Sequence, residues 1–152
     1  MNAVTRMSKA LLYWASLGRS AASHLTSGKR QPLLTGALQD AIFKSANFSC
    51  IACDAQGVIQ IFNVGAEHML GYRADEVIDR VSPSDLHDPM EVTARAVVLS
   101  TELGTPIAPG FEALAFKASR GIEDIYELTY IRKDGSRFPA IVSITALRDD
   151  AG

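Results

Sequence analysis

Apolar and polar positions repeat with two different periods along the chain, and each change of period marks a predicted element. Apolar residues recur every three or four positions over residues 33–46, which predicts a helix with one apolar side. Its apolar side comprises Leu34, Leu38, Ile42 and Phe43. A β pattern follows in residues 49–53 and 58–62, and the turn-forming residues 54–57 between them predict a hairpin.

The middle of the chain returns to the helical period. Asn63 is a suitable N-cap for a short helix at 66–70, which Gly71 ends. Asp88-Pro89 begins the longest predicted helix, since an Asp cap followed by Pro at the first position is typical of a helix start. Gly104 ends it. Two further short helices are predicted, at residues 74–79 and 111–118.

The last third carries a strong β signal around Asp134-Gly135. Residues 125–133 and 136–147 flank this pair, which is typical of a two-residue type I′ hairpin turn. Such a turn fixes the register of the two strands, and with it the face on which each side chain lies. The predicted pairs are Ile131 with Phe138, Thr129 with Ala140, Glu127 with Val142, and Ile125 with Ile144.

The first thirty residues fit neither pattern over a long stretch. Met7, Leu11, Trp14 and Gly18 recur at helical spacing, which predicts a short helix within an extension at residues 1–32 that is otherwise disordered. Three functional alternatives remain for this segment: membrane contact, targeting, or packing on the domain or on a partner. Residues 33–152 are predicted to form one domain.

Charge divides the chain at nearly the same place. The net charge is −2, but residues 1–39 hold five basic residues and no acidic one, which leaves residues 40–152 with a balance of −7. An acidic main domain argues against a nucleic-acid-binding surface. Two cysteines cannot make a disulfide framework, and no apolar run is long enough to cross a membrane. A cytoplasmic location is therefore expected.

Two motifs, in this order and at this separation, carry a family resemblance. Asn63, Ala66-Glu67, Leu70-Gly71-Tyr72 and Glu76-Val77 resemble the first half of a PAS sensor domain. The run from Tyr130 to Phe138, with Ile141–Thr145 and Asp149, resembles the second half. The likeness covers residues 35–149 and is greatest to PAS modules of bacterial sensor histidine kinases, the two-component signalling proteins. It implies an α+β fold, an antiparallel sheet with short helices packed on one face.

The resemblance also implies a five-stranded sheet whose last strand in sequence lies in the middle. The chain shows four strand signals and ends at Gly152, so a fifth central strand is expected to be missing. Three outcomes are open. The chain is a C-terminally truncated piece, which we favour; or its first and last predicted strands pair directly; or a partner, or residues 1–30, fills the gap.

The predicted register assigns the two faces of the last hairpin. By resemblance, one face meets the helices and contributes to a ligand pocket, with Thr129 as the best polar contact. The pocket candidates are Met69, Leu86, Val92, Ala96, Leu99, Glu127, Thr129, Ile131, Val142 and Ile144. The opposite face is too apolar to stay in water, so we expect the helix at 33–46 or a second subunit to cover it. This dimer or helix-docking face comprises Tyr126, Leu128, Tyr130, Ile141 and Leu147.

Motifs for metal, haem or flavin chemistry are weak. Cys50 and Cys53 have the spacing of half a zinc site, but no second pair of ligands is evident and both lie in a predicted strand, so structural roles are expected. His87 precedes the long helix rather than lying within it, which disfavours haem; His68 is expected at the surface and His24 in the extension. LOV photoreceptors, a branch of the family, carry a cysteine where this chain has Ser82, which disfavours a flavin adduct.

The resemblance therefore implies a binding and signalling module rather than an enzyme. No nucleophile–base arrangement, phosphate-binding loop or kinase motif is visible. The expected function is binding of a small metabolite or a partner, relayed to a fused output domain such as a histidine kinase, in a homodimer. The alternatives are a ligand-free dimerisation or protein-interaction module, and a flavin- or haem-based redox or gas sensor.

Overall fold

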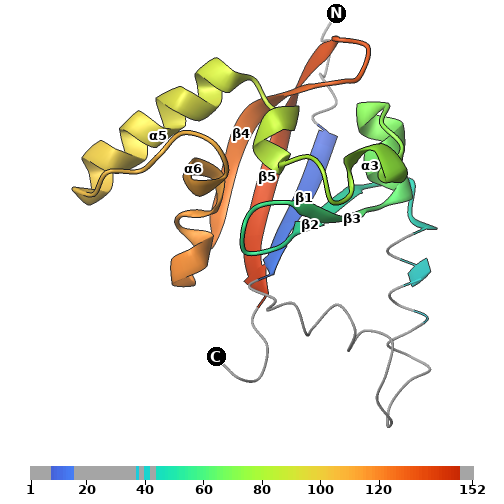
Figure 1. Ribbon diagram of the computed structural model, residues 1–152, viewed down its shortest axis with the longest axis horizontal. Helices are drawn as coiled ribbons and strands as arrows, with labels where there is room; N and C mark the ends of the chain where they lie inside the picture. Colours follow the sequence, from blue (N-terminus) through green and yellow to red (C-terminus); the bar gives the residue numbers. More distant parts are fainter. Residues whose placement is uncertain (1–7, 16–36, 38–39, 42–43, 148–152) are drawn as a thin grey trace, which may run out of the picture.

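A computed structural model describes residues 8–15, 37, 40–41 and 44–147. For residues 8–15 and for Leu147 it describes the backbone alone. The chain forms a five-stranded sheet in the order β3-β2-β1-β5-β4 (Figure 1). The strands are β1 (Ser8–Ala15), β2 (Ser49–Cys53), β3 (Ile59–Phe62), β4 (Asp124–Ile131) and β5 (Arg137–Leu147).

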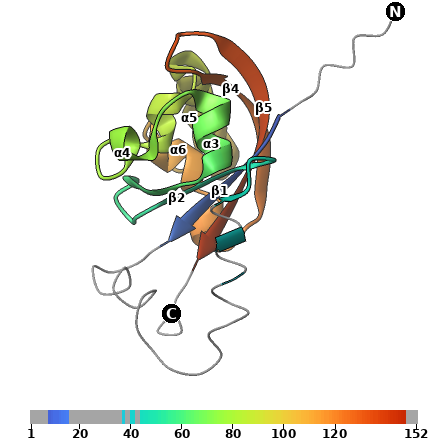
Figure 2. The same cartoon turned by 90° about the vertical axis from the view of Figure 1, so that its right-hand side faces the viewer.

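The helices α3 to α6 lie on one side of this sheet (Figure 2). Their bounds are α3 (Val64–Leu70), α4 (Ala74–Val77), α5 (Pro89–Leu103) and α6 (Phe111–Ala115), with the 3-10 turns η1 (Pro83–Leu86) and η2 (Ala118–Arg120). The buried apolar side chains of these helices and of the strands form one cluster between the two layers. An α+β fold with helices on one face of the sheet is therefore confirmed.

Local signals in the sequence placed the helix starts correctly. Asn63 caps α3, with its side chain accepting a hydrogen bond from the backbone N–H of Ala66 at 2.9 Å. Asp88 caps α5 in the same way, accepting from Met90 and Glu91, and Pro89 occupies the first turn. The predicted hairpin of β2 and β3 is also present, with antiparallel pairing. Of the helix predicted over 33–46, the described residues 37, 40, 41 and 44 are helical and exposed.

Residues 8–15 form a strand, so the helix predicted there from the spacing of Leu11 and Trp14 is wrong. β1 lies between β2 and β5 and runs parallel to both. It pairs at five positions with β2 and at eight with β5. The central seam that the sequence left open is therefore filled, by the N-terminal segment. Because β1 belongs to the sheet, the fold also begins well before the domain boundary expected at residue 33.

The hairpin between β4 and β5 has a register one residue away from the predicted one. Tyr130 pairs with Phe138, and Leu128 with Ala140. The turn explains the shift: the N–H of Gly135 bonds the carbonyl of Arg132 at 2.9 Å, and in this turn only Gly135 has a positive φ. A type I′ turn needs two positive φ values, whereas a type I turn followed by one left-handed residue makes a three-residue loop.

A one-residue shift moves side chains of a strand to the opposite face. Leu128 and Tyr130 are buried in the core with Ala140, Val142 and Ile144, and Tyr126 packs against them. The assignment of Tyr126, Leu128 and Tyr130 to an outer docking face is therefore wrong.

The residues predicted to line the pocket from β4 alternate with these core residues. Glu127 is exposed, and Thr129 and Ile131 are half-buried outside the core cluster. Ile141, the register partner of Glu127, is half-buried, and Leu147 pairs with Ala15. Val142 and Ile144 are on the face predicted for them. Leu34, Leu38, Ile42 and Phe43, the predicted apolar side of the 33–46 helix, lie outside the described residues, so its docking stays a prediction.

Candidate functional site

The core between the sheet and the helices contains most of the predicted pocket residues. Leu86, Val92, Ala96 and Leu99 are each 2–3% exposed, and Met69 packs against the same cluster. These residues come from η1, α5 and the end of α3. Leu86, Val92, Ala96 and Leu99 are themselves part of the apolar cluster between the helices and the sheet. A ligand in this region would therefore need the helical layer to move relative to the sheet.

A buried histidine lies at the centre of this region, where η1 leads into α5. His87 is 1% exposed, and its ring stacks on that of Tyr130 with centroids 4.1 Å apart. Its Nδ1 lies 2.8 Å from the carbonyl oxygen of Pro83, which can only accept. Nδ1 therefore carries the proton, and Nε2 of the neutral ring presents a lone pair that no described protein group contacts by a hydrogen bond.

Tyr130 supplies a second buried polar atom without a hydrogen-bond partner. Its ring is fully buried, and its hydroxyl has no hydrogen-bond partner among the described residues. Burial raises the pKa of this hydroxyl, so it stays protonated and can donate. We call His87 and Tyr130 together the polar core pair. Buried polar atoms in a folded protein are nearly always bonded, so two orphan atoms on stacked rings are a marked exception.

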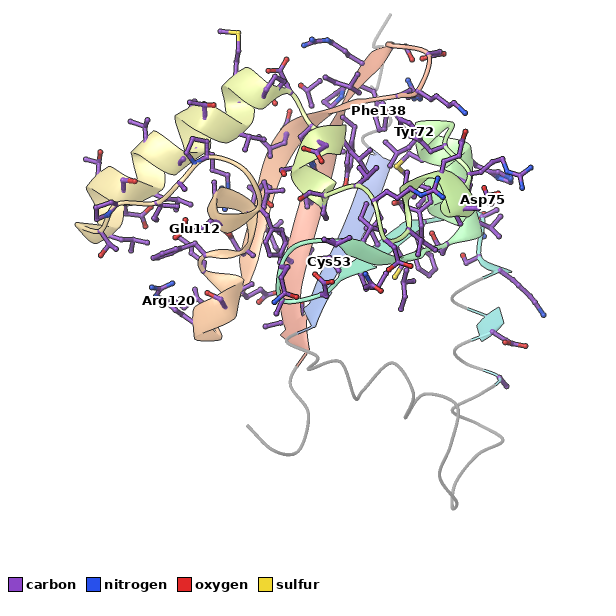
Figure 3. All side chains as sticks on the ribbon, in the orientation of Figure 1. Cys53, Tyr72, Asp75, Glu112, Arg120 and Phe138 are labelled. Atoms are coloured by element: carbon purple, nitrogen blue, oxygen red, sulfur yellow. The ribbon has the colours of Figure 1, made fainter. Side chains whose placement is uncertain are left out.

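The hairpin turn of β4 and β5 closes one end of this core. Phe138 packs against Tyr130 with ring centroids 5.7 Å apart, and the Arg132 guanidinium lies 4.0 Å from the centroid of Phe138. Nε of Arg132 donates to the carbonyl of Met69 at 2.9 Å. Figure 3 shows Phe138 near the turn end of β5 and Tyr72 just after α3. The turn is thus bonded directly to the end of α3.

An ion pair joins α5 to the start of β4, beside the core. Arg95 bonds Asp124, and both side chains are largely buried, with 15% and 8% exposed. The guanidinium also donates to the carbonyl of Ala113 at 2.9 Å and lies 3.6 Å from the ring centroid of Tyr126. The pair fixes α5 and α6 against the sheet. Sequence reasoning missed it, although Arg95 falls within the apolar stripe of α5 that includes Val92 and Leu99.

The outer edge of β4 is bonded to the first turn of α5. The Glu91 carboxylate accepts from the N–H of Thr129 at 2.7 Å and from its hydroxyl at 2.9 Å. The carbonyl of Thr129 in turn accepts from the N–H of Asp88 at 2.9 Å. Thr129, expected as a ligand contact, is thus engaged in joining strand to helix, and a movement of α5 would be transmitted to β4.

The residues considered for metal chemistry are not brought together. Cys50 and Cys53 are both buried in β2, and burial raises the thiol pKa to about 11 and about 12 respectively. Thiols with such high pKa values are poor nucleophiles and poor metal ligands at neutral pH. Within the described part of the chain, no group of three or more His, Cys, Asp or Glu side chains could hold a metal ion.

Burial of His87 makes the stability of the domain depend on pH. Desolvation lowers the pKa of the folded imidazole from 6.5 to about 4. Between these values the unfolded chain binds a proton that the folded chain does not, so stability falls as pH drops from about 6.5 to about 4. We expect a loss on the order of 3 kcal/mol in the free energy of unfolding, from about 1.4 kcal/mol per pKa unit.

Urea titrations across this pH range measure the effect. In His87→Phe, the free energy of unfolding should vary much less with pH above pH 4.5. The matched variant His68→Gln, at an exposed position, should keep the pH dependence of the wild type. Carboxylates with lowered pKa, such as those of Asp88 and Asp134, lose their stabilising effect only at more acidic pH. Equal pH dependence of the wild type and His87→Phe would contradict the buried position of His87.

A surface pocket in the described part of the chain has fewer features of a binding site than the polar core pair. This shallow pocket, near the end of α5, is lined by Ser100, Thr101, Gly104, Thr105, Pro106 and Ile107, none of which is ionisable. No helix among the described residues is long and apolar enough to cross a membrane. The polar core pair and its surroundings therefore remain the candidate site.

The chain resembles known proteins in its sequence and in its structure. The chain is similar to the light-state structure of the LOV domain of the blue-light photoreceptor Aureochrome1, with 21% identity, 78% of this chain and 79% of that one covered, and a TM-score of 0.46. No curated protein matches the chain. The family model described as PAS domain matches residues 47–152, which is more than half of the sequence. The chain therefore belongs to the PAS domain family.

Proposed function

We propose that this PAS domain is a sensory module that binds a small polar metabolite at the polar core pair and transmits the event to an output domain. Membership of the PAS family supports a sensory signalling role. The observation that carries the ligand is the pair of orphan polar atoms, Nε2 of His87 and the hydroxyl of Tyr130. An acceptor and a donor on two stacked rings suit a ligand with both functions, such as a hydroxyl or an amide.

Transmission would follow the bonds between the helical layer and the sheet. α5 is attached to β4 through Glu91 and through the pair of Arg95 with Asp124, and the β4–β5 turn is attached to α3 through Arg132. A ligand that separates His87 from Tyr130 would move the start of α5 relative to β4. Such a change biases two packing states that differ by a few kcal/mol, which is how a binding event becomes a signal.

The output, assembly and location belong to the same proposal. We infer a fused or associated signalling partner such as a histidine kinase, a homodimer, and a bacterial cytoplasmic setting, without catalytic activity of the chain itself. A ligand-free interaction module is the second candidate, and the close packing of Leu86, Val92 and Ile144 supports it. A flavin- or haem-bearing sensor would show visible absorption, and the buried thiols, whose raised pKa keeps them protonated, give ligation of a haem by thiolate little support.

Mass spectrometry of molecules released from the gently purified full chain tests the proposal. We expect a metabolite in stoichiometric amount, or a rise in melting temperature with members of a metabolite library. Tyr130→Phe removes only the hydroxyl, so it should weaken binding at least about fivefold, since a lost hydrogen bond is worth about 1 kcal/mol.

The same variant separates ligand binding from a purely structural role. Without ligand, removing an orphan hydroxyl should leave the stability unchanged or raise it. Retained affinity in Tyr130→Phe would disprove the site. The absence of any released molecule and of any shift in melting temperature would favour the ligand-free module instead.

A further inference from the structure

The position of β1 depends on strands that are distant in sequence. Its closest neighbour along the chain is β2, which is separated from Ala15 at the end of β1 by 33 residues, and β5 is far more distant. No tight turn connects β1 to either neighbour. Its register, Leu11 with Cys50 and Ser143, is therefore not fixed by a turn.

The direction of β1 also shows that no tight turn connects it to β2 or β5. A strand that follows β5 through a short turn would run antiparallel to it, whereas β1 runs parallel to both of its neighbours. Parallel neighbours require long connections, and residues 16–48 supply one. Residues 37, 40, 41 and 44 of this connection are helical, and even at the helical rise of about 1.5 Å per residue a chain of its length spans about 50 Å, more than the width of one small domain. It is long enough to place β1 in a neighbouring molecule.

Exchange of β1 between two copies would preserve every pair in the sheet. The seam between β2 and β5 of one copy accepts the strand of the other in the same register, and a two-fold axis makes the exchange reciprocal. Insertion of β1 into the seam of its own chain is favoured only by the high effective concentration of the tethered strand. This effective concentration falls as the connection lengthens.

Charge favours the encounter between copies. The segment that carries β1, residues 1–39, holds five basic residues and no acidic one, and residues 40–152 carry a balance of −7. A basic arm and an acidic body attract each other between two copies of the same chain.

We propose that two copies of this chain exchange residues 8–15, each inserting its β1 between β2 and β5 of the other. The seam of each copy is then completed by its partner. The proposal concerns assembly and does not depend on a ligand at the polar core pair.

Engineered thiols at the seam test the exchange in the full chain. The donor variant carries Leu11→Cys with Cys50→Ala and Cys53→Ala, and the acceptor carries Cys53→Ala and retains Cys50. Each then has one thiol, and Leu11 and Cys50 are register partners. After the two are unfolded together, refolded and treated with oxidised glutathione, two thiols form one disulfide while glutathione takes up the two electrons.

We expect a covalent donor–acceptor dimer on a non-reducing gel, in a yield that rises with protein concentration. The matched control donor carries Leu12→Cys, whose register partner is Ile51, and it should give at least fivefold less cross-link. An equal yield from the two donors would overturn the register, and no mixed dimer would overturn the exchange. Sedimentation equilibrium of the unmodified chain avoids folding defects of variants: a dimer is expected, and a monomer from micromolar to millimolar concentration would overturn the proposal.

Discussion

Leu12→Pro should abolish cooperative unfolding of the domain. Leu12 is central in β1 and is the register partner of both Ile51 and Ile144. Proline removes a backbone donor and cannot continue the ladder in the middle of a sheet. The seam would then lose ordered pairing on both sides, with an expected cost of at least about 3 kcal/mol. Urea denaturation followed by far-UV circular dichroism measures the loss.

The first residue of the same strand supplies the control. Proline is tolerated where a strand begins, so Ser8→Pro should cost less than about 1 kcal/mol. A cooperative transition of undiminished midpoint in Leu12→Pro would show that β1 does not lie in the seam. A similar loss in both variants would point to an effect of proline on the whole segment rather than on the ladder.

The short-range features of this fold were predictable because adjacent residues determine them. Asn63 and Asp88 mark helix starts through side-chain caps, and the turn residues 54–57 between two short β runs mark the hairpin of β2 and β3. β1 was not predictable in the same way. The apolar run Leu11–Trp14 does not alternate with polar residues, so it fits a helix as well as a strand.

The register of the last hairpin shows how a small local difference changes the site. Asp134-Gly135 fits a two-residue turn and also the end of a three-residue loop, and the choice depends on the φ angle of Asp134. The structure has the longer loop, which brings Tyr130 into the core in place of Thr129. The sequence therefore placed Leu86, Val92, Ala96 and Leu99 in the core, where the structure has them, but assigned the alternating residues of β4 to the wrong face. Ligand binding by these residues stays a prediction.

Buried polar residues were the least predictable part. Arg95, Asp124 and His87 belong to residue types that are usually exposed, and only the tertiary structure supplies the partners that let them be buried. Arg95 within an apolar helical stripe was the one available signal. The same holds for the polar core pair, since His87 and Tyr130 are 43 positions apart and meet through the antiparallel bridge between His87, just after η1, and Tyr130 in β4.

Asn63→Ala should destabilise the domain by about 3 kcal/mol or more. The amide oxygen of Asn63 accepts from the N–H groups of Cys50 and Ala66, both at 2.9 Å. Its nitrogen donates to the carbonyls of Ser45 and Phe48, at 3.3 and 3.1 Å. With 2% of the residue exposed, water cannot replace these bonds, and each unsatisfied buried group costs about 1–3 kcal/mol.

Asn63→Asp distinguishes the hydrogen bonds that the side chain accepts from those that it donates. Aspartate keeps both acceptor bonds, but as a carboxylate it loses the donors and faces the carbonyl oxygens of Ser45 and Phe48. Burial beside these oxygens should raise the folded pKa of the new carboxyl above its unfolded value. The stability of the variant is then highest below the unfolded pKa, near 4, and falls as pH rises through the folded pKa.

Urea titrations at several pH values measure both effects, with Gln60→Ala as the matched control. Gln60 is an exposed amide on β3 that bonds Asp54 at 3.3 Å, so its loss should change the free energy of unfolding by less than about 0.5 kcal/mol. An Asn63→Ala cost as small as that of the control would mean that water reaches the junction of β2 and α3. In that case Asn63 would act as an ordinary helix cap and not as the group that joins strand, helix and the segment at residues 45–48.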